Sequence, residues 1–107
     1  MAGDPCAGRR HPSTATLVLD DATRRARRGS RPLGLTPAEY RLLSHLLDKA
    51  ECVVSKEQIS QQVWGDFRAS EAIEKLVSRL RRKVDQGETP LIHTSRGFGY
   101  WFGRAHD

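Results

Sequence analysis

The most constraining feature of this chain is the apolar repeat in residues 70–86, which predicts an amphipathic helix with one buried face. Ile73, Val77, Leu80 and Val84 follow one another at spacings of four, three and four residues. They therefore share one side of a helix with about 3.6 residues per turn. The rest of the circumference is polar and mostly basic, with the side chains of Lys75, Ser78, Arg79, Arg81, Arg82 and Lys83. Such a helix needs a partner for its apolar face and presents a cationic face outward.

The charge order of this helix does not by itself decide its function. Glu71 and Glu74 precede the cations, an order that the helix dipole favours in any well-formed helix. Ser70 is the expected N-cap, because its hydroxyl can accept a hydrogen bond from an orphan backbone N–H. Isolated charge runs are usually solvated faces, so the helix alone leaves a nucleic-acid surface and a solvated surface equally open.

The segment after the helix predicts a β-hairpin with an arginine at its tip. Residues 91–95 form a strand candidate, and the aromatic residues 100–102 form the returning strand. Gly97 and Gly99 let the backbone turn tightly beside Arg96. An arginine on a narrow tip can enter a DNA minor groove, where negative potential is concentrated. The alternative is that the glycines make the turn and Arg96 is merely exposed.

Length and charge bound the class of protein. The 107 residues are enough for one domain of ordinary size with a modest core. The formal net charge of +5 suits a polyanionic partner, although many soluble proteins are as basic. No apolar run is long enough to span a membrane, and the first residues lack the apolar core of a signal peptide. A cytoplasmic protein without a membrane partner is therefore expected.

The sequence contains no recognisable metal, cofactor or catalytic pattern. Cys6 and Cys52 are too few for a disulfide framework, which favours a reducing compartment. His93, Asp85 and Ser95 follow no pattern of nucleophilic catalysis. The histidines are scattered and form no zinc-ligand spacing; they are His11, His45, His93 and His106. We expect no cofactor and no enzymatic activity, with His93 as a partly buried structural residue.

The remaining sequence predicts a short sheet and two helices ahead of the basic helix. Residues 1–14 are rich in small residues and turn formers and are expected to be a disordered tail. The folded domain is expected over residues 15–103, followed by a second tail at residues 104–107. Within the domain, short strands are expected at residues 15–20, 23–28 and 31–35.

Two capping motifs predict where the next helices begin. Thr36 and Glu39 have the spacing of a capping box, and Pro37 suits the first helical position between them. Ser55 and Gln58 repeat the same spacing. The two predicted helices cover residues 37–49 and 56–63.

Two helices that lead into a basic third helix make a helix-turn-helix variant, in which the last helix lies in the major groove. A hairpin after that helix makes a wing. The expected fold class is therefore α+β: a winged helix-turn-helix with a short N-terminal antiparallel sheet, three helices and a C-terminal β-hairpin wing.

Five sequence blocks, taken in order, resemble the winged-helix DNA-binding (effector) domains of OmpR/PhoB-type bacterial response regulators. The blocks are LTPAEYRLL at residues 35–43, VVSKEQI at 53–59, VWG at 63–65, VSRLRRKV at 77–84 and IHTSRGFGY at 92–100. Each block is short, but their order and spacing together are specific. The resemblance covers roughly residues 15–103, which is nearly all of the expected folded domain.

The resemblance implies sequence-specific binding of double-stranded DNA in transcription regulation, with the third helix, about residues 70–86, in the major groove. Arg79 matches a base-contacting position, and arginine suits guanine because the O6 and N7 atoms accept its forked donors. Arg81 matches a phosphate-contacting position and Thr94 a backbone-contacting one. Arg96 matches the minor-groove arginine of the wing. The residues matched to DNA contact are Lys75, Ser78, Arg79, Arg81, Arg82, Thr94 and Arg96.

The resemblance also implies further partners. Residues 64–69 correspond to a loop that some members present to RNA polymerase. These regulators usually carry a phosphoacceptor receiver domain before the effector domain, and this chain is too short to include one. We expect a monomer in isolation, with pairing on DNA at adjacent half-sites. The strand arginines could face solvent, another domain or DNA; they are Arg24, Arg25, Arg27 and Arg28.

One alternative function remains open from the sequence. Winged helices are also used as docking surfaces, because a fold does not dictate a function. In that case the basic helix would bind an acidic protein partner.

Overall fold

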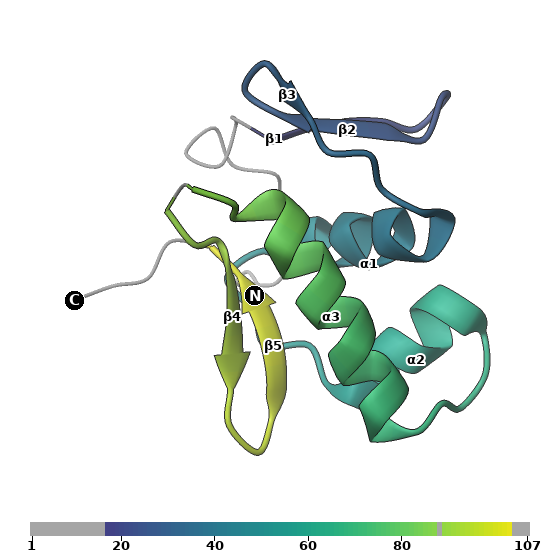
Figure 1. Ribbon diagram of the computed structural model, residues 1–107. Helices are drawn as coiled ribbons and strands as arrows, with labels where there is room; N and C mark the ends of the chain where they lie inside the picture. Colours follow the sequence, from purple (N-terminus) through teal and green to yellow (C-terminus); the bar gives the residue numbers. More distant parts are fainter. Residues whose placement is uncertain (1–16, 88, 104–107) are drawn as a thin grey trace, which may run out of the picture.

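The computed structural model describes residues 17–87 and 89–103, and the predicted tails at 1–14 and 104–107 lie outside the described residues. The elements are β1 (Leu17–Asp20), β2 (Arg25–Arg28), β3 (Arg31–Pro32), α1 (Pro37–Asp48), α2 (Lys56–Trp64), α3 (Ser70–Val84), β4 (Ile92–Ser95) and β5 (Gly99–Phe102). Three helices lie between a three-stranded sheet and a β-hairpin (Figure 1). This order confirms the predicted α+β winged helix-turn-helix. No helix among the described residues is long and apolar enough to cross a membrane.

Helices α1 and α2 both start at the predicted capping boxes. Thr36 Oγ1 accepts a hydrogen bond from the Glu39 backbone N–H, and Glu39 Oε1 accepts one from the Thr36 N–H, at N···O distances of 3.2 and 2.9 Å. Ser55 and Gln58 make the same reciprocal pair at the start of α2. Both arrangements satisfy backbone donors that a helix cannot satisfy internally.

The prediction that Ser70 caps α3 is wrong. Ala69 occupies the N-cap position, and no side chain among the described residues caps this helix. Ser70 is instead the first helical residue, and its hydroxyl accepts from Lys56 Nζ at 2.7 Å and donates to Glu74 at 3.2 Å. Because Lys56 also contacts Glu74 at 2.9 Å, these side chains join the starts of α2 and α3.

The core lies where the three helices meet β5. Leu42, Leu43 and Leu46 of α1 and Leu80 of α3 are fully buried, as is Phe102 of β5. Burial of a leucine or phenylalanine side chain of this kind contributes about 1.5–3 kcal/mol to folding. The predicted apolar face of the basic helix is confirmed; its buried residues are Ile73, Leu76, Val77, Leu80 and Val84.

The hairpin β4–β5 with its turn, residues 92–102, is called the wing. It is anchored to the rest of the domain by its second strand. The Val54 N–H donates to the Tyr100 carbonyl at 2.7 Å, and the Tyr100 N–H donates back to Val54 at 2.9 Å. Strands β4 and β5 pair antiparallel, with His93 opposite Trp101. Those two rings stack with centroids 4.3 Å apart. His93 Nε2 donates a hydrogen bond to the Gly103 carbonyl at 2.8 Å. Both contacts are expected for a partly buried structural histidine.

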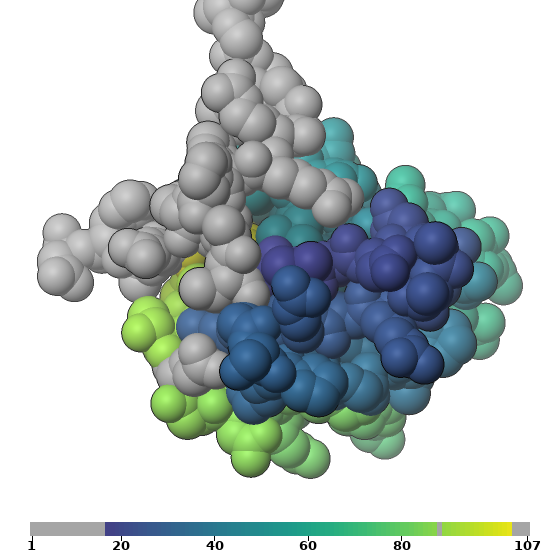
Figure 2. All heavy atoms as spheres, turned by 90° about the horizontal axis from the view of Figure 1, so that it is seen from above, coloured from purple at the N-terminus to yellow at the C-terminus, as the bar shows by residue number. Residues whose placement is uncertain are grey.

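The N-terminal sheet covers one end of the helices. Its strand order is β1-β2-β3, and all pairs are antiparallel. Strand β2 alternates, with Arg25 and Arg27 exposed and Ala26 and Arg28 buried. Viewed from above, residues of this sheet and of the segment after it form most of the described face (Figure 2). Because Arg25 and Arg27 alternate with the buried Ala26 and Arg28, they lie on the exposed face of the sheet.

Arg28 and Arg31 cap the C-terminus of α3. The Arg28 guanidinium donates to the Val84 carbonyl at 2.8 Å and to the Thr89 carbonyl at 2.7 Å. The Arg31 guanidinium donates to the Lys83 carbonyl at 2.8 Å and to the Val84 carbonyl at 3.0 Å. The last carbonyls of a helix lack internal donors and carry partial negative charge. Two cations from the sheet therefore stabilise the end of the basic helix.

This contact corrects the expectation for one of the strand arginines. Arg28 is only 6% exposed and lies 3.4 Å from Asp85, so it does not face solvent, DNA or another domain. Asp85 in turn accepts backbone hydrogen bonds from Leu91 and Ile92. Arg28 is therefore a structural residue that joins the sheet, α3 and the strand that follows it.

Cys52 is nearly buried and is disulfide-bonded in the structure. Cys6, the other cysteine of the chain, lies outside the described residues. The reducing setting inferred from the cysteine count therefore gains no support from Cys52.

Candidate nucleic-acid interface

The outer face of α3 carries the predicted DNA-contacting residues of the helix. Lys75, Ser78, Arg79 and Arg82 are all exposed, on the side opposite the buried apolar face. Lys75 forms an exposed pair with Glu71 one turn earlier, at 3.9 Å. In Figure 1, α3 runs across the front of the domain with the wing beside it. The apolar face of α3 thus packs against the core while its cationic face is exposed, as insertion into a DNA groove requires.

Arg81 and Thr94 join α3 to the wing. The Arg81 guanidinium donates to Thr94 Oγ1 at 2.8 Å, across 13 residues of sequence. Arg81 is half-buried, and its Nε has no hydrogen-bond partner among the described residues. The structure therefore brings together two residues that were matched separately to the DNA backbone.

Loss of the Thr94 hydroxyl is expected to weaken DNA binding on every sequence alike. In Thr94→Val, Arg81 loses a charge-assisted hydrogen bond and the wing loses one tie to α3. The expected cost is about 1 kcal/mol of binding free energy. Kd values for an A·T-rich and a G·C-rich duplex measure it, with Ser95→Ala on the same strand as the control. A loss confined to one duplex would mean that Thr94 reads sequence.

The tip of the wing presents Arg96 next to an exposed aromatic ring. Residues 96–98 form the turn, which the Phe98 N–H closes by donating to the Ser95 carbonyl at 2.9 Å. Arg96 is exposed, and Phe98 is 73% exposed. The exposure of Phe98 was not predicted from the sequence. An aromatic residue between two glycines at a hairpin tip has no core to enter, and that position was the missed signal.

A groove of about 430 Å³ separates the wing from the starts of α2 and α3. Its walls include Lys56 and Glu74 on the helical side and Thr94, Arg96 and Phe98 on the wing. The tip of the wing is therefore set apart from the helix starts, while Arg81 and Thr94 join the wing to α3.

Glu39 lies behind the cationic face and connects it to α1. Its side chain is 1% exposed, although it carries a carboxylate. Lys83 Nζ donates to Glu39 Oε1 at 2.6 Å and to the Gly34 carbonyl at 3.0 Å. Arg79 Nε lies 3.5 Å from Glu39 Oε2. The local sequence predicts only a capping role for Glu39, because nothing near it indicates a partner 40 or more residues away.

Burial and its partners act in opposite directions on Glu39. Burial by itself raises the pKa of this carboxyl. The hydrogen bonds from Lys83 and the Thr36 backbone, with the charges of Lys83 and Arg79, outweigh burial and hold the pKa below its ordinary value of 4.5. Glu39 is therefore ionised at neutral pH inside the domain.

The lowered pKa predicts a specific acid sensitivity. A carboxyl whose pKa is lower in the folded state contributes stability above its ordinary pKa, and this is lost as the pH falls through the folded value. Urea unfolding from neutral pH to about pH 3 should show a steeper decline in the wild type than in Glu39→Gln. Glu57→Gln, which removes an exposed carboxylate of α2, should follow the wild type. Parallel wild-type and Glu39→Gln curves would contradict the prediction.

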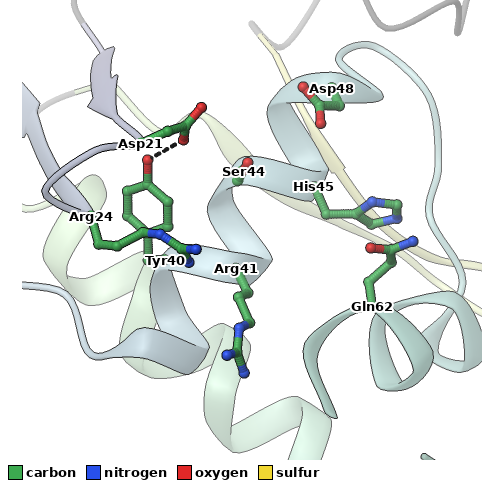
Figure 3. A pocket seen from close by; sticks show the side chains of 8 residues that line it. All are labelled: Asp21, Arg24, Tyr40, Arg41, Ser44, His45, Asp48 and Gln62. Carbon is green, nitrogen blue, oxygen red and sulfur yellow. Dashed lines mark hydrogen bonds between the residues drawn. The ribbon is translucent and has the colours of Figure 1, made fainter. Parts of the chain in front are cut away.

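A second cavity, of about 250 Å³, is lined by residues of the β1–β2 turn, α1 and α2 (Figure 3). Tyr40 donates a hydrogen bond to Asp21, and Arg24 lies over the Tyr40 ring at 5.8 Å. Burial and Asp21 raise the pKa of Tyr40 to about 12. Burial lowers the pKa of His45, which turns toward Gln62 in Figure 3. The contacts of Asp21 and Arg24 with Tyr40 connect the β1–β2 turn to α1. The cavity is away from the cationic face of α3.

The fold agrees with the comparisons with known proteins. Residues 30–102 match the model of the family described as "Transcriptional regulatory protein, C terminal". The chain belongs to this family. These are the effector domains of OmpR/PhoB-type response regulators.

Two curated relatives and one solved structure illustrate the similarity of this effector domain. The chain is 42% identical over 86 residues to the probable transcriptional regulatory protein TcrX of Mycobacterium tuberculosis, covering 78% of this chain and 37% of the relative. It is 46% identical over 87 residues to the response regulator MprA of Mycolicibacterium vanbaalenii, covering 78% and 38%. The DNA-binding domain of CpxR from E. coli superposes with a TM-score of 0.74 at 35% identity, covering 85% of this chain and 93% of that one.

The effector domain spans less than two-fifths of the length of these two curated relatives. They are regulators of which this chain matches one part. Within the described residues, no cluster of three or more histidine, cysteine or acidic side chains could hold a metal ion.

Proposed function

We propose that this effector domain binds double-stranded DNA sequence-specifically as part of a bacterial transcription regulator. The observation that carries the proposal is the exposed cationic face of α3 beside a wing with Arg96 at its tip. Membership of the transcriptional regulatory family supports it. The similarity to the CpxR DNA-binding domain at 35% identity points the same way.

The proposed contacts divide into positioning and reading. Arg79, the most central cation of the outer face, reads a base edge in the major groove, where guanine offers two acceptors to its fork. Arg81 and Thr94 together hold a phosphate between α3 and the wing. Arg96 enters the neighbouring minor groove. Lys75, Ser78 and Arg82 complete the contact surface of α3.

Further partners are proposed for the whole regulator. A receiver domain is the natural candidate for the remaining length of the relatives. The short α2–α3 connection, with exposed Phe67 and with Arg68 over the Trp64 ring, is the candidate polymerase contact. The isolated domain is proposed to be monomeric and to pair on adjacent half-sites. Because the proposed target is chromosomal DNA, we propose that the regulator acts in the bacterial cytoplasm.

The proposal is tested by selecting bound duplexes from a random pool with the purified chain. The expected outcome is an enriched motif that survives competition by random DNA, with binding that weakens steeply with salt because counterions are released. A pool that stays random after several rounds would contradict sequence-specific binding. Absence of any duplex binding at low salt would favour the acidic protein partner instead.

A further inference from the structure

The two oxygens of Glu39 have different partners. Oε1 accepts from Lys83 Nζ and from the Thr36 N–H, at 2.6 and 2.9 Å. Oε2 is buried and has no hydrogen-bond partner among the described residues. Arg79 Nε lies 3.5 Å from it and forms an ion pair with it. The structural duties of Glu39, the cap and the tie to Lys83, are therefore carried by one oxygen, while the other faces the proposed base-reading arginine.

The ion pair with Glu39 is made through Nε of the Arg79 guanidinium. An arginine has five N–H donors in a planar fork, and a bidentate contact to guanine uses the terminal nitrogens. Nε faces inward to Glu39, and the Arg79 side chain as a whole is 56% exposed. The buried carboxylate can thus hold the base of the fork while the terminal nitrogens stay available to DNA.

We propose that Glu39 is a positioning residue for DNA reading, which restrains Arg79 through Oε2 so that its fork is pre-oriented toward the major groove. This inference rests on the proposed function. Ordering a long side chain on binding costs about 0.5–1.5 kcal/mol, and a side chain that is already ordered avoids much of that cost. Glu39 acts through Arg79 and does not itself contact DNA.

The charge of Glu39 makes this role distinguishable from simple electrostatics. A carboxylate behind the cationic face repels phosphates, so its removal alone should strengthen binding to every duplex or leave it unchanged. Loss of positioning should weaken only the binding that depends on the Arg79 fork. On a selected duplex, the loss of positioning should therefore lower the affinity. On a scrambled duplex of the same composition, loss of the carboxylate should raise the affinity or leave it unchanged.

A double-mutant cycle between Glu39 and Arg79 tests the proposal. Kd values are measured for Glu39→Gln, Arg79→Ala and the double variant, on the selected duplex and on its scramble. We expect Glu39→Gln to lower the ratio of the two affinities about 3- to 10-fold, without weakening binding to the scramble. In the Arg79→Ala background, Glu39→Gln should leave the ratio unchanged, because its effect passes through Arg79. Glu57→Gln, which removes an equal charge from α2, should keep the wild-type ratio.

Two outcomes of the cycle would overturn the proposal. An unchanged affinity ratio in Glu39→Gln would show that Arg79 needs no restraint. An equal drop of the ratio in both backgrounds would show that Glu39 acts through the fold and not through Arg79. If the wild type itself does not distinguish the selected duplex from the scramble, the proposed function fails rather than the positioning role.

A measurement on the wild-type chain covers the case in which Glu39→Gln does not fold. The Nε–H proton of Arg79 should exchange with solvent more slowly than that of Arg82, which is exposed on the same helix. Protection of Arg79 should be lost as acid protonates Glu39. Equal exchange of the two Nε–H protons at neutral pH would overturn the contact on which the inference depends.

Discussion

Arg79→Ala is expected to lower the affinity for a selected duplex by about 1–3 kcal/mol, with a much smaller loss on a scrambled duplex. The reason is the position of Arg79, which is exposed on the outer face of α3 with its Nε toward Glu39. A bidentate contact to guanine depends on the base, whereas the attraction of one charge to phosphate does not. Fluorescence-anisotropy titrations of both duplexes give the two losses directly.

The control for Arg79→Ala is Arg25→Ala. It removes the same charge from an exposed position in the N-terminal sheet, away from α3. Arg25→Ala should change both affinities little. Arg81→Ala should lower both alike, because Arg81 is proposed to hold phosphate and is tied to the wing through Thr94. Equal losses from Arg79→Ala on both duplexes would contradict its assignment as the reading residue.

Gly99→Ala is expected to destabilise the domain by about 4 kcal/mol, from strain and overpacking together. Gly99 has a φ of +147°, and a β-carbon there would lie 2.0 Å from the Val54 carbonyl oxygen. Neither side can move easily, because Val54 and Tyr100 exchange backbone hydrogen bonds at this point. The substitution therefore separates the wing from the helices. Urea denaturation followed by circular dichroism measures the loss in unfolding free energy.

Gly97→Ala is the matched control for Gly99→Ala. Gly97 is in the same hairpin and also has a positive φ, of +79°, but no described atom lies within 4 Å of a β-carbon added there. Only the conformational cost of about 1–2 kcal/mol remains. Similar losses for the two variants would show that the close approach to Val54 does not limit this position.

The fold was predictable where local spacing carries the information. The capping boxes at Thr36 and Ser55 and the apolar face of residues 70–86 depend on residues within one or two helical turns. The burial of Arg28 was not predicted, because its partners at Val84 and Thr89 lie 56 and 61 residues away. Strand alternation predicts that some of the arginines in β2 face inward, but it does not indicate that the end of a helix is there to receive one.

For the candidate site, the sequence predicts which side chains are exposed but not which of them contact one another. A helical repeat separates the outer face of α3 from its core face, so the exposure of Lys75, Arg79 and Arg82 follows from spacing alone. The link from Arg81 to Thr94 depends on how the wing packs against α3. The contact between Glu39 and Arg79 depends on how α1 crosses α3. Tertiary packing therefore converts a set of separate candidates into a connected surface.

The most direct test of sequence-specific DNA binding is a salt titration of the purified chain against the selected duplex and its scramble. We expect both affinities to fall steeply as salt rises, and the selected duplex to stay preferred throughout. A preference that survives screening cannot come from attraction to phosphates alone, because that attraction is the same for both duplexes. Equal affinities for the two duplexes at every salt concentration would contradict the claim.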